Sequence, residues 1–147
     1  MAEVICVVPV APLRAEGSHR AEMVSQLLFG ETALVLNETK DFYHIQMHQD
    51  GYEGWCQKLQ LQIVAEGATI STKGYTANWT NSAVLNGQPI QLSIGTPIVA
   101  YTSSDFDFFY EGATCLPASN TYTPEGLEKV AKQFLGTSYL WGGRSVF

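Results

Sequence analysis

The first 64 residues alternate short apolar runs with turn residues, a pattern typical of a small β domain. The clearest runs lie at 4–10, 32–36, 42–48 and 52–56. Between the last two stands Asp50-Gly51, which is a strong signal for a tight hairpin turn. Five short strands within about sixty residues favour a small barrel, because a single open sheet would leave exposed edges.

Residues 65–121 repeat this pattern more loosely and predict a second small barrel. Its apolar runs lie at 67–73, 89–93, 97–101, 106–110 and 114–116, and Asn86-Gly87 marks a turn. We expect the runs 89–93 and 97–101 to pair with each other, and the last two runs to do the same. A longer polar insertion is expected at 74–81.

The pattern changes at Thr123, where one amphipathic helix is expected over 124–135. Thr123 is a good N-cap, and Pro124 suits the first helical position. The apolar stripe has the helical period and consists of Leu127, Val130, Ala131, Phe134 and Leu135. Gly136 is a natural terminator, and the eleven residues after it are too few to bury the stripe. We expect the helix to fold back onto the barrels or to self-associate with a second copy.

The charge balance narrows the expected partners. Eight Lys+Arg against fourteen Asp+Glu give the 147-residue chain a formal net charge of -6. This disfavours nucleic acid, because proteins that bind it gather Lys and Arg on one face. It equally disfavours anionic membranes and anionic wall polymers. The expected partners are small molecules that are neutral or carry an amine.

The sequence also bears on the compartment. No run approaches the ~18 apolar residues that a membrane-spanning helix requires. The apolar start, 1–10, has no basic n-region, so we expect no signal peptide and a cytoplasmic protein. Cys6, Cys56 and Cys115 are odd in number and widely spaced, which predicts free buried thiols.

Metal and base-stacking sites find little support. His44 and His48 share the polar face of the 42–48 strand, but no third ligand is apparent, so we expect no metal and no cofactor. The aromatic run 106–110 has no Lys or Arg nearby, and we interpret it as core and interdomain packing.

The last residues carry a resemblance to a known family. After the amphipathic helix comes Tyr139-Leu140-Trp141-Gly142-Gly143, which resembles the opening of an NlpC/P60 cysteine peptidase domain. In that family Asp-Cys-Ser-Gly-Phe follows shortly, with the nucleophilic Cys at the start of the next helix. Gly54-Trp55 and the segment 26–31 resemble a bacterial SH3 domain. In particular, they are similar to the first of two such domains in γ-D-glutamyl-L-diamino acid endopeptidases of the dipeptidyl-peptidase VI type.

The resemblance implies the architecture of the whole chain. The fold class is mainly β, with two small SH3-like barrels followed by one amphipathic helix that starts a papain-like α+β domain. The implied domains are a first bacterial SH3 domain at 1–64, a second SH3-like domain at 65–121 and an N-terminal stub of the NlpC/P60 catalytic domain at 122–147.

A cysteine peptidase needs a thiolate of low pKa and a His base. The family places its thiol at a helix N-terminus, which favours the anion. Cys6, Cys56 and Cys115 lie in β runs, and His19 lies in a loop. The catalytic Cys and His are therefore expected beyond Phe147, so that the parent protein is a hydrolase while this chain alone is inactive.

The resemblance also implies substrate-binding residues. In the family, the first SH3 domain closes one end of the cleft, so that only stem peptides with a free N-terminal L-Ala fit. Tyr52, Glu53 and Glu31 are the candidates for reading that amine, and Tyr139 would contact substrate or oxyanion. Trp141, Gly142 and Gly143 would be structural residues near the active site.

Simpler interpretations stay open for several of these residues. Trp55 is a core or barrel-lip aromatic in one interpretation and a ligand contact in the other. Tyr52 either packs on the surface or recognises substrate. Glu31 and Glu53 are either solvated turn carboxylates or amine readers.

The leading hypothesis is a substrate-specificity region of a cysteine endopeptidase for murein peptide recycling. The parent would cleave the γ-D-Glu–diamino acid bond of murein stem peptides with a free N-terminal L-Ala, and a missing catalytic domain would be its partner. The alternative is a stand-alone tandem SH3 module that binds peptides or cell-wall fragments without catalysis. A third hypothesis is that the SH3 pair only scaffolds the enzyme.

Overall fold

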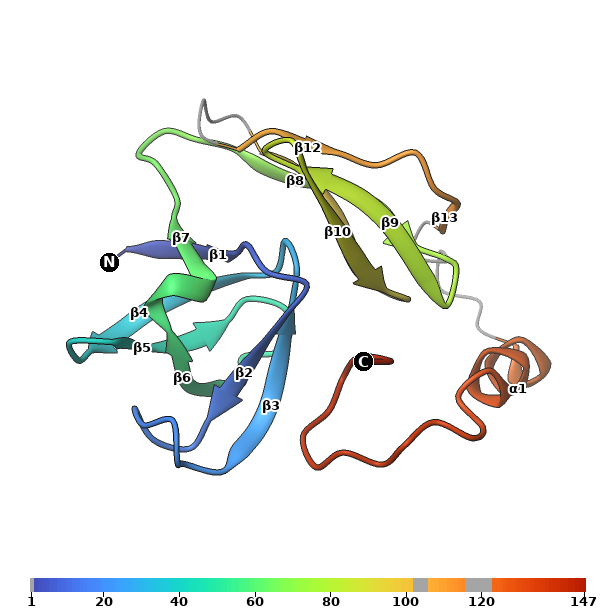
Figure 1. The fold of residues 1–147 in the computed structure, drawn as a ribbon, viewed down its shortest axis with the longest axis horizontal. Coiled ribbons are helices and arrows are strands. Elements are labelled where there is room, and N and C mark those ends of the chain that lie inside the picture. Colours follow the sequence, from blue (N-terminus) through green and yellow to red (C-terminus); the bar gives the residue numbers. More distant parts are fainter. Residues whose placement is uncertain (1, 102–105, 116–122) are drawn as a thin grey trace.

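The structure is a computed structural model that describes residues 2–101, 106–115 and 123–147. It consists of two β units side by side, followed by one helix (Figure 1). After the helix the chain returns, so that its C-terminal end lies between the two β units (Figure 1).

The first unit is one seven-stranded antiparallel sheet in the order β3-β2-β6-β5-β4-β1-β7. Its strands are β1 (Glu3–Cys6), β2 (Val10–Arg14), β3 (Met23–Leu28), β4 (Thr32–Glu38), β5 (Phe42–Met47), β6 (Glu53–Gln57) and β7 (Leu61–Ile63), with a short 3-10 helix, η1 (Lys58–Gln60), before β7. The sheet encloses a core in which Leu13, Leu27 and Ile45 are fully buried. The predicted hairpin at Asp50-Gly51 is confirmed, with Gly51 at a φ of 73°.

The second unit consists of two three-stranded antiparallel sheets, β10-β9-β12 and β11-β8-β13. Its strands are β8 (Ile70–Thr76), β9 (Thr80–Leu85), β10 (Gln88–Ser93), β11 (Pro97–Tyr101), β12 (Phe108–Phe109) and β13 (Thr114–Cys115). Asn86 and Gly87 have positive φ angles and form the predicted turn, which joins β9 to β10. The predicted fold class, small SH3-like β units plus one helix, is confirmed for the described residues.

Several expectations for the second unit are wrong. β10 pairs with β9 and β11 pairs with β8, so the runs 89–93 and 97–101 do not pair with each other. β12 and β13 likewise pair with β9 and β8. The expected polar insertion at 74–81 is instead the end of β8, a short connection and the start of β9. Similarly, the apolar run 4–10 is divided between β1 and β2.

The two units share hydrophobic packing. Ile5 and Phe29, which lie in the first unit, are fully buried in the core cluster of the second. The Phe29 ring centroid lies 5.8 Å from that of Phe106 and 4.7 Å from that of Phe108. The interpretation of the run 106–110 as interdomain packing is therefore confirmed for Phe106 and Phe108.

The helix α1 (Pro124–Lys132) has the predicted N-cap, because the Thr123 hydroxyl accepts a hydrogen bond from the Gly126 N–H at 3.1 Å. It ends three residues before the expected 135, and Gly136 follows with a φ of 87°. None of its residues is buried, and Leu127 is 62% exposed. Only just beyond the helix does a ring contact form, between Phe134 and Trp79, with centroids 5.1 Å apart. The predicted apolar stripe is therefore largely uncovered.

Candidate functional site

The C-terminal tail, residues 136–147, is anchored through Arg144 to the first β unit, called the first barrel below. Its guanidinium donates two parallel hydrogen bonds to the carboxylate of Glu31, Nη1 to Oε2 and Nη2 to Oε1, both 2.8 Å long. Nη1 also donates to the main-chain oxygen of Gln26 at 2.7 Å. This two-pronged arrangement matches the planar fork of arginine to a carboxylate, which is the strongest form of ion pair in proteins.

Glu31 is held in place by the turn between β3 and β4. Gly30 takes a φ of 78°, and the Leu28 N–H donates to Glu31 Oε2 at 2.9 Å. Glu31 is only 6% exposed. The interpretation of Glu31 as a solvated turn carboxylate is therefore wrong, because the carboxylate is buried and paired with Arg144.

The main chain of the tail is also bound. Gln26 Oε1 accepts hydrogen bonds from the N–H groups of Arg144 at 2.7 Å and Ser145 at 3.2 Å. The Val146 N–H donates to Ser93 Oγ at 3.1 Å, and Ser93 belongs to the second unit. The tail is thus bonded to both β units.

Gly142 of the tail lies where a larger residue would not fit. Gly142 has a φ of 70°, which side chains rarely adopt, and its Cα faces the main chain of β3. A Cβ there would lie 2.8 Å from the carbonyl carbon of Val24 and 3.0 Å from the Ser25 nitrogen. The close approach of the tail to β3 therefore requires glycine.

Burial and pairing act in opposite directions on Arg144. Burial alone would lower the pKa of its guanidinium, but the hydrogen bonds and negative charge of Glu31, with a smaller contribution from Asp50, raise the pKa above its ordinary value. The guanidinium therefore stays charged. Asp50 and Gln49, which lies 3.5 Å from Arg144 Nη2, place the turn between β5 and β6 beside this pair.

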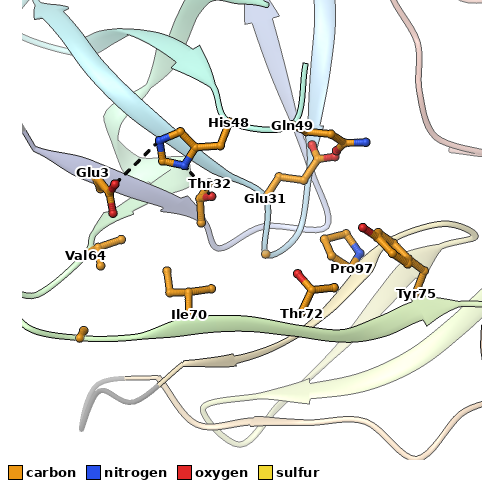
Figure 2. A pocket seen from close by; sticks show the side chains of 12 residues that line it. Glu3, Glu31, Thr32, His48, Gln49, Val64, Ile70, Thr72, Tyr75 and Pro97 are labelled. Atoms are coloured by element: carbon orange, nitrogen blue, oxygen red, sulfur yellow. Dashed lines mark hydrogen bonds and ion pairs between the residues drawn. The ribbon is translucent and has the colours of Figure 1, made fainter. Parts of the chain in front are cut away.

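A cavity of about 400 Å³ lies between the two units (Figure 2). On the first unit, His48 Nδ1 lies 3.0 Å from Thr32 Oγ1, and His48 Nε2 lies 3.8 Å from a Glu3 oxygen. Ile70 and Thr72 face them from the second unit (Figure 2). Glu31 lines the cavity as well, so the cavity and the tail anchor share one carboxylate.

The other candidate residues are accessible. Tyr52 is 45% exposed, and the neighbouring Glu53 accepts a hydrogen bond from Gln46 Nε2 at 3.0 Å. Tyr139 is 83% and Trp141 61% exposed. The structure therefore pairs Glu31 with Arg144 of the tail, whereas Tyr52, Tyr139 and Trp141 have exposed side chains.

Trp55 lies at the barrel surface and is half-buried. Its ring stacks on that of His44 with centroids 5.0 Å apart. The ring also packs against Gly17, where an added Cβ would lie 3.0 Å from a ring atom. These contacts agree with the interpretation of Trp55 as a barrel-lip aromatic.

The cysteines in the described core are unreactive by environment. Cys6 and Cys56 are free and buried, as predicted. Burial raises the pKa of the Cys56 thiol to about 12 and that of Cys6 still further. A thiol in such surroundings is protonated at neutral pH and is a poor nucleophile. The side chain of Cys115 lies outside the described part of the structure.

No group of three or more His, Cys, Asp or Glu that could hold a metal occurs among residues 2–101, 106–115 and 123–147. Within the same ranges, no helix has the length and apolar character needed to cross a bilayer.

Sequence reasoning missed Arg144, Gln26 and Ser93 as parts of the site. Arg144 is the only cation in the twelve-residue tail, which is the one signal that could have singled it out. Its partner Glu31 lies 113 positions away, and no local pattern links the two.

Comparisons with known proteins agree with this architecture. Residues 13–61 match the family model described as the bacterial dipeptidyl-peptidase SH3 domain. A solved NlpC/P60 family protein from Bacillus cereus superposes with a TM-score of 0.69 and 16% sequence identity, covering 99% of this chain and 67% of that one. No curated protein matches the chain. These findings confirm the resemblance to a bacterial dipeptidyl-peptidase SH3 domain over residues 13–61 and show that the chain shares its fold with an NlpC/P60 family protein.

Proposed function

We propose that this chain is the N-terminal specificity region of an NlpC/P60 cysteine peptidase, in which the first SH3 barrel forms part of the substrate cleft. The observation that supports it is the tail, where the Tyr139–Gly143 motif leads into Arg144 and Arg144 is bound by that barrel. In NlpC/P60 peptidases this motif shortly precedes the nucleophilic cysteine. The barrel would then lie next to the reacting atoms.

The proposed substrate is a murein stem peptide with a free N-terminal L-Ala, cleaved between γ-D-Glu and the diamino acid. An ammonium group needs a carboxylate or aromatic face to bind to. Tyr52 and Glu53 are exposed, and they follow the same turn whose residues Gln49 and Asp50 lie beside Arg144. Tyr52 and Glu53 therefore directly follow the turn that lies beside the tail anchor.

The proposed role is recycling of released peptides in the cytoplasm. The net charge of -6 disfavours binding to anionic wall polymer but suits a ligand with a free amine. The catalytic Cys and His would belong to a domain that follows Phe147.

The reading frame after Phe147 gives the first test. An Asp-Cys-Ser-Gly-like sequence within about ten residues supports the proposal, because the nucleophile must lie on the adjoining helix. Its absence contradicts the peptidase function.

The second test concerns the free amine. The protein with its catalytic domain is assayed on L-Ala-γ-D-Glu-diaminopimelate and on the N-acetylated form of the same peptide. Tyr52→Ala should reduce the preference for the free amine at least about tenfold, whereas Leu59→Ala, an exposed site on the same barrel, should not. Unchanged preference in Tyr52→Ala would instead favour a scaffold role.

A third measurement tests the alternative that the chain is a stand-alone binding module. NMR titration compares L-Ala-D-Glu with intact cross-linked murein. Preference for the dipeptide supports the specificity region, and preference for the polymer supports a wall-binding module.

A further inference from the structure

We infer that Arg144 is a positioning residue, and that Glu31 acts through Arg144 rather than on substrate. The Glu31–Arg144 pair, called the latch below, would fix the tail that leads toward the nucleophile. This inference rests on the proposed function for its catalytic consequence, but the latch itself is a property of the 147-residue chain.

Both oxygens of the Glu31 carboxylate already accept hydrogen bonds, and its side chain is only 5% exposed. Oε1 accepts from Arg144 Nη2, while Oε2 accepts from Arg144 Nη1 and from the Leu28 N–H. A substrate ammonium at Glu31 would have to compete with the guanidinium for a buried carboxylate, and displacing the guanidinium would leave Arg144 half-buried without its counter-charge. Among the described residues, Arg144 is the one cation ion-paired with Glu31.

The latch does more than join two side chains. Gln26 receives both the Arg144 N–H and the Ser145 N–H, so the main chain on either side of the guanidinium is fixed as well. Two residues before Arg144, Gly142 lies against the main chain of β3 at Val24 and Ser25. The position and direction of the tail are thus specified over consecutive residues, which a single surface ion pair would not achieve.

A catalytic nucleophile must be held close to its productive geometry, and small displacements reduce rate strongly. The latch connects the tail to the turn between β3 and β4, two strands of the seven-stranded sheet. Loss of the latch is therefore expected to lower kcat more than it raises KM. An amine reader, in contrast, would change the preference for free over acylated peptide.

The first experiment uses the 147-residue chain and needs no activity. Amide hydrogen exchange is measured at Arg144, Ser145 and Val146 in wild type, Glu31→Gln and Arg144→Ala. Each variant should speed exchange at least about tenfold while exchange in β5 stays unchanged. Glu38→Gln is the matched control, since it breaks another ion pair of the same barrel, with Lys58, away from the tail.

A double-mutant cycle guards against a folding artefact. Glu31→Gln keeps the acceptor for the Leu28 N–H, and Arg144→Ala leaves the barrel core untouched. If the two residues act as one latch, the double variant should exchange no faster than the single variants. Independent, multiplying effects, or unchanged exchange in Arg144→Ala, would overturn the latch.

The second experiment tests the catalytic consequence in the protein with its catalytic domain. Glu31→Gln and Arg144→Ala should each lower kcat at least about tenfold with KM changed less than threefold, and Arg144→Lys should restore part of kcat. The preference for free over N-acetylated peptide should be unchanged. Loss of that preference in Glu31→Gln would show that Glu31 reads the amine instead.

The two experiments separate the two proposals. If the variants exchange fast but the protein with its catalytic domain shows no peptidase activity, the latch is supported and the proposed function is rejected. Normal exchange in the variants of an active peptidase rejects the latch and keeps the function.

Discussion

The first barrel and the C-terminal segment are stabilised in different ways. The barrel encloses ten residues buried in one apolar cluster, whereas α1 buries none of its own. The tail after α1 is held by hydrogen bonds and one ion pair that the barrels provide. The comparison shows that the barrel can hold its own shape, while the tail takes its position from the barrel.

The largest loss of stability is expected for Phe29→Ala, which removes packing from the core that the two units share. Phe29 is fully buried where the two units meet, so its removal leaves a cavity in the shared core. We expect a loss of about 3–5 kcal/mol in the free energy of unfolding, measured by urea denaturation. Phe109→Ala, at a site 56% exposed, should cost less than about 0.5 kcal/mol. A loss below about 1 kcal/mol for Phe29→Ala would mean that the two units are not coupled through it.

High pH should affect the barrel but not the tail. The Cys56 thiol ionises near its ordinary pKa of 9.0 when unfolded, but only near 12 when folded. Between these values the unfolded state has released a proton that the folded state retains. The free energy of unfolding should therefore fall as pH rises above 9, by about 1.4 kcal/mol per pH unit for each such thiol.

Urea denaturation at pH 7.5, 9 and 10 measures this fall. Cys56→Ala should be less stable at pH 7.5 yet show a shallower slope with pH. An identical slope in that variant would assign the fall to other groups.

Gly142→Ala should release the tail without unfolding the barrel. The variant combines the cost of a positive φ with a contact of 2.8 Å against the main chain at Val24. We expect docking of the tail to weaken by about 1–2 kcal/mol, seen as faster amide exchange at Arg144 and Ser145. Gly136→Ala is the matched control, because Gly136 also has a positive φ but nothing within 4 Å. Equal effects in both variants would exclude the contact with β3 as the cause.

The smallest effect is expected for Thr123→Ala. Loss of the hydroxyl that caps α1 should destabilise the helix by about 1 kcal/mol, because the Gly126 N–H loses its acceptor. Circular dichroism and the NMR shifts of α1 measure the change, and the barrel transition should not move. Thr123→Ser retains the acceptor and should behave like wild type.

Local chemistry explains which features were predictable. Asp50-Gly51 and Asn86-Gly87 have residues that favour positive φ, and both turns form as expected. The capped start of α1 is also local, because the Thr123 side chain accepts from the Gly126 N–H and Pro124 suits the first helical position. In each case the determining interaction lies within a few residues along the chain.

Strand partners could not be predicted in this way. Gly95-Thr96 resembles a hairpin turn, yet it connects β10 and β11, which lie in different sheets. The partner of β10 is β9 (Thr80–Leu85), which mixes polar and apolar residues and whose first two residues fall within the polar insertion expected at 74–81. Pairing is decided by which faces bury apolar side chains across both units, and this information is not local.

The contact of the tail with β3 has a consequence for solubility. β3 lies at the end of the sheet order and hydrogen-bonds to a strand on one side only. An uncovered strand edge is a template for pairing with another molecule, and proteins commonly shield such edges with a loop. By lying against Val24 and Ser25, the segment around Gly142 provides that shield. Deleting residues 136–147 should therefore make the protein prone to aggregate even though the barrel core is untouched.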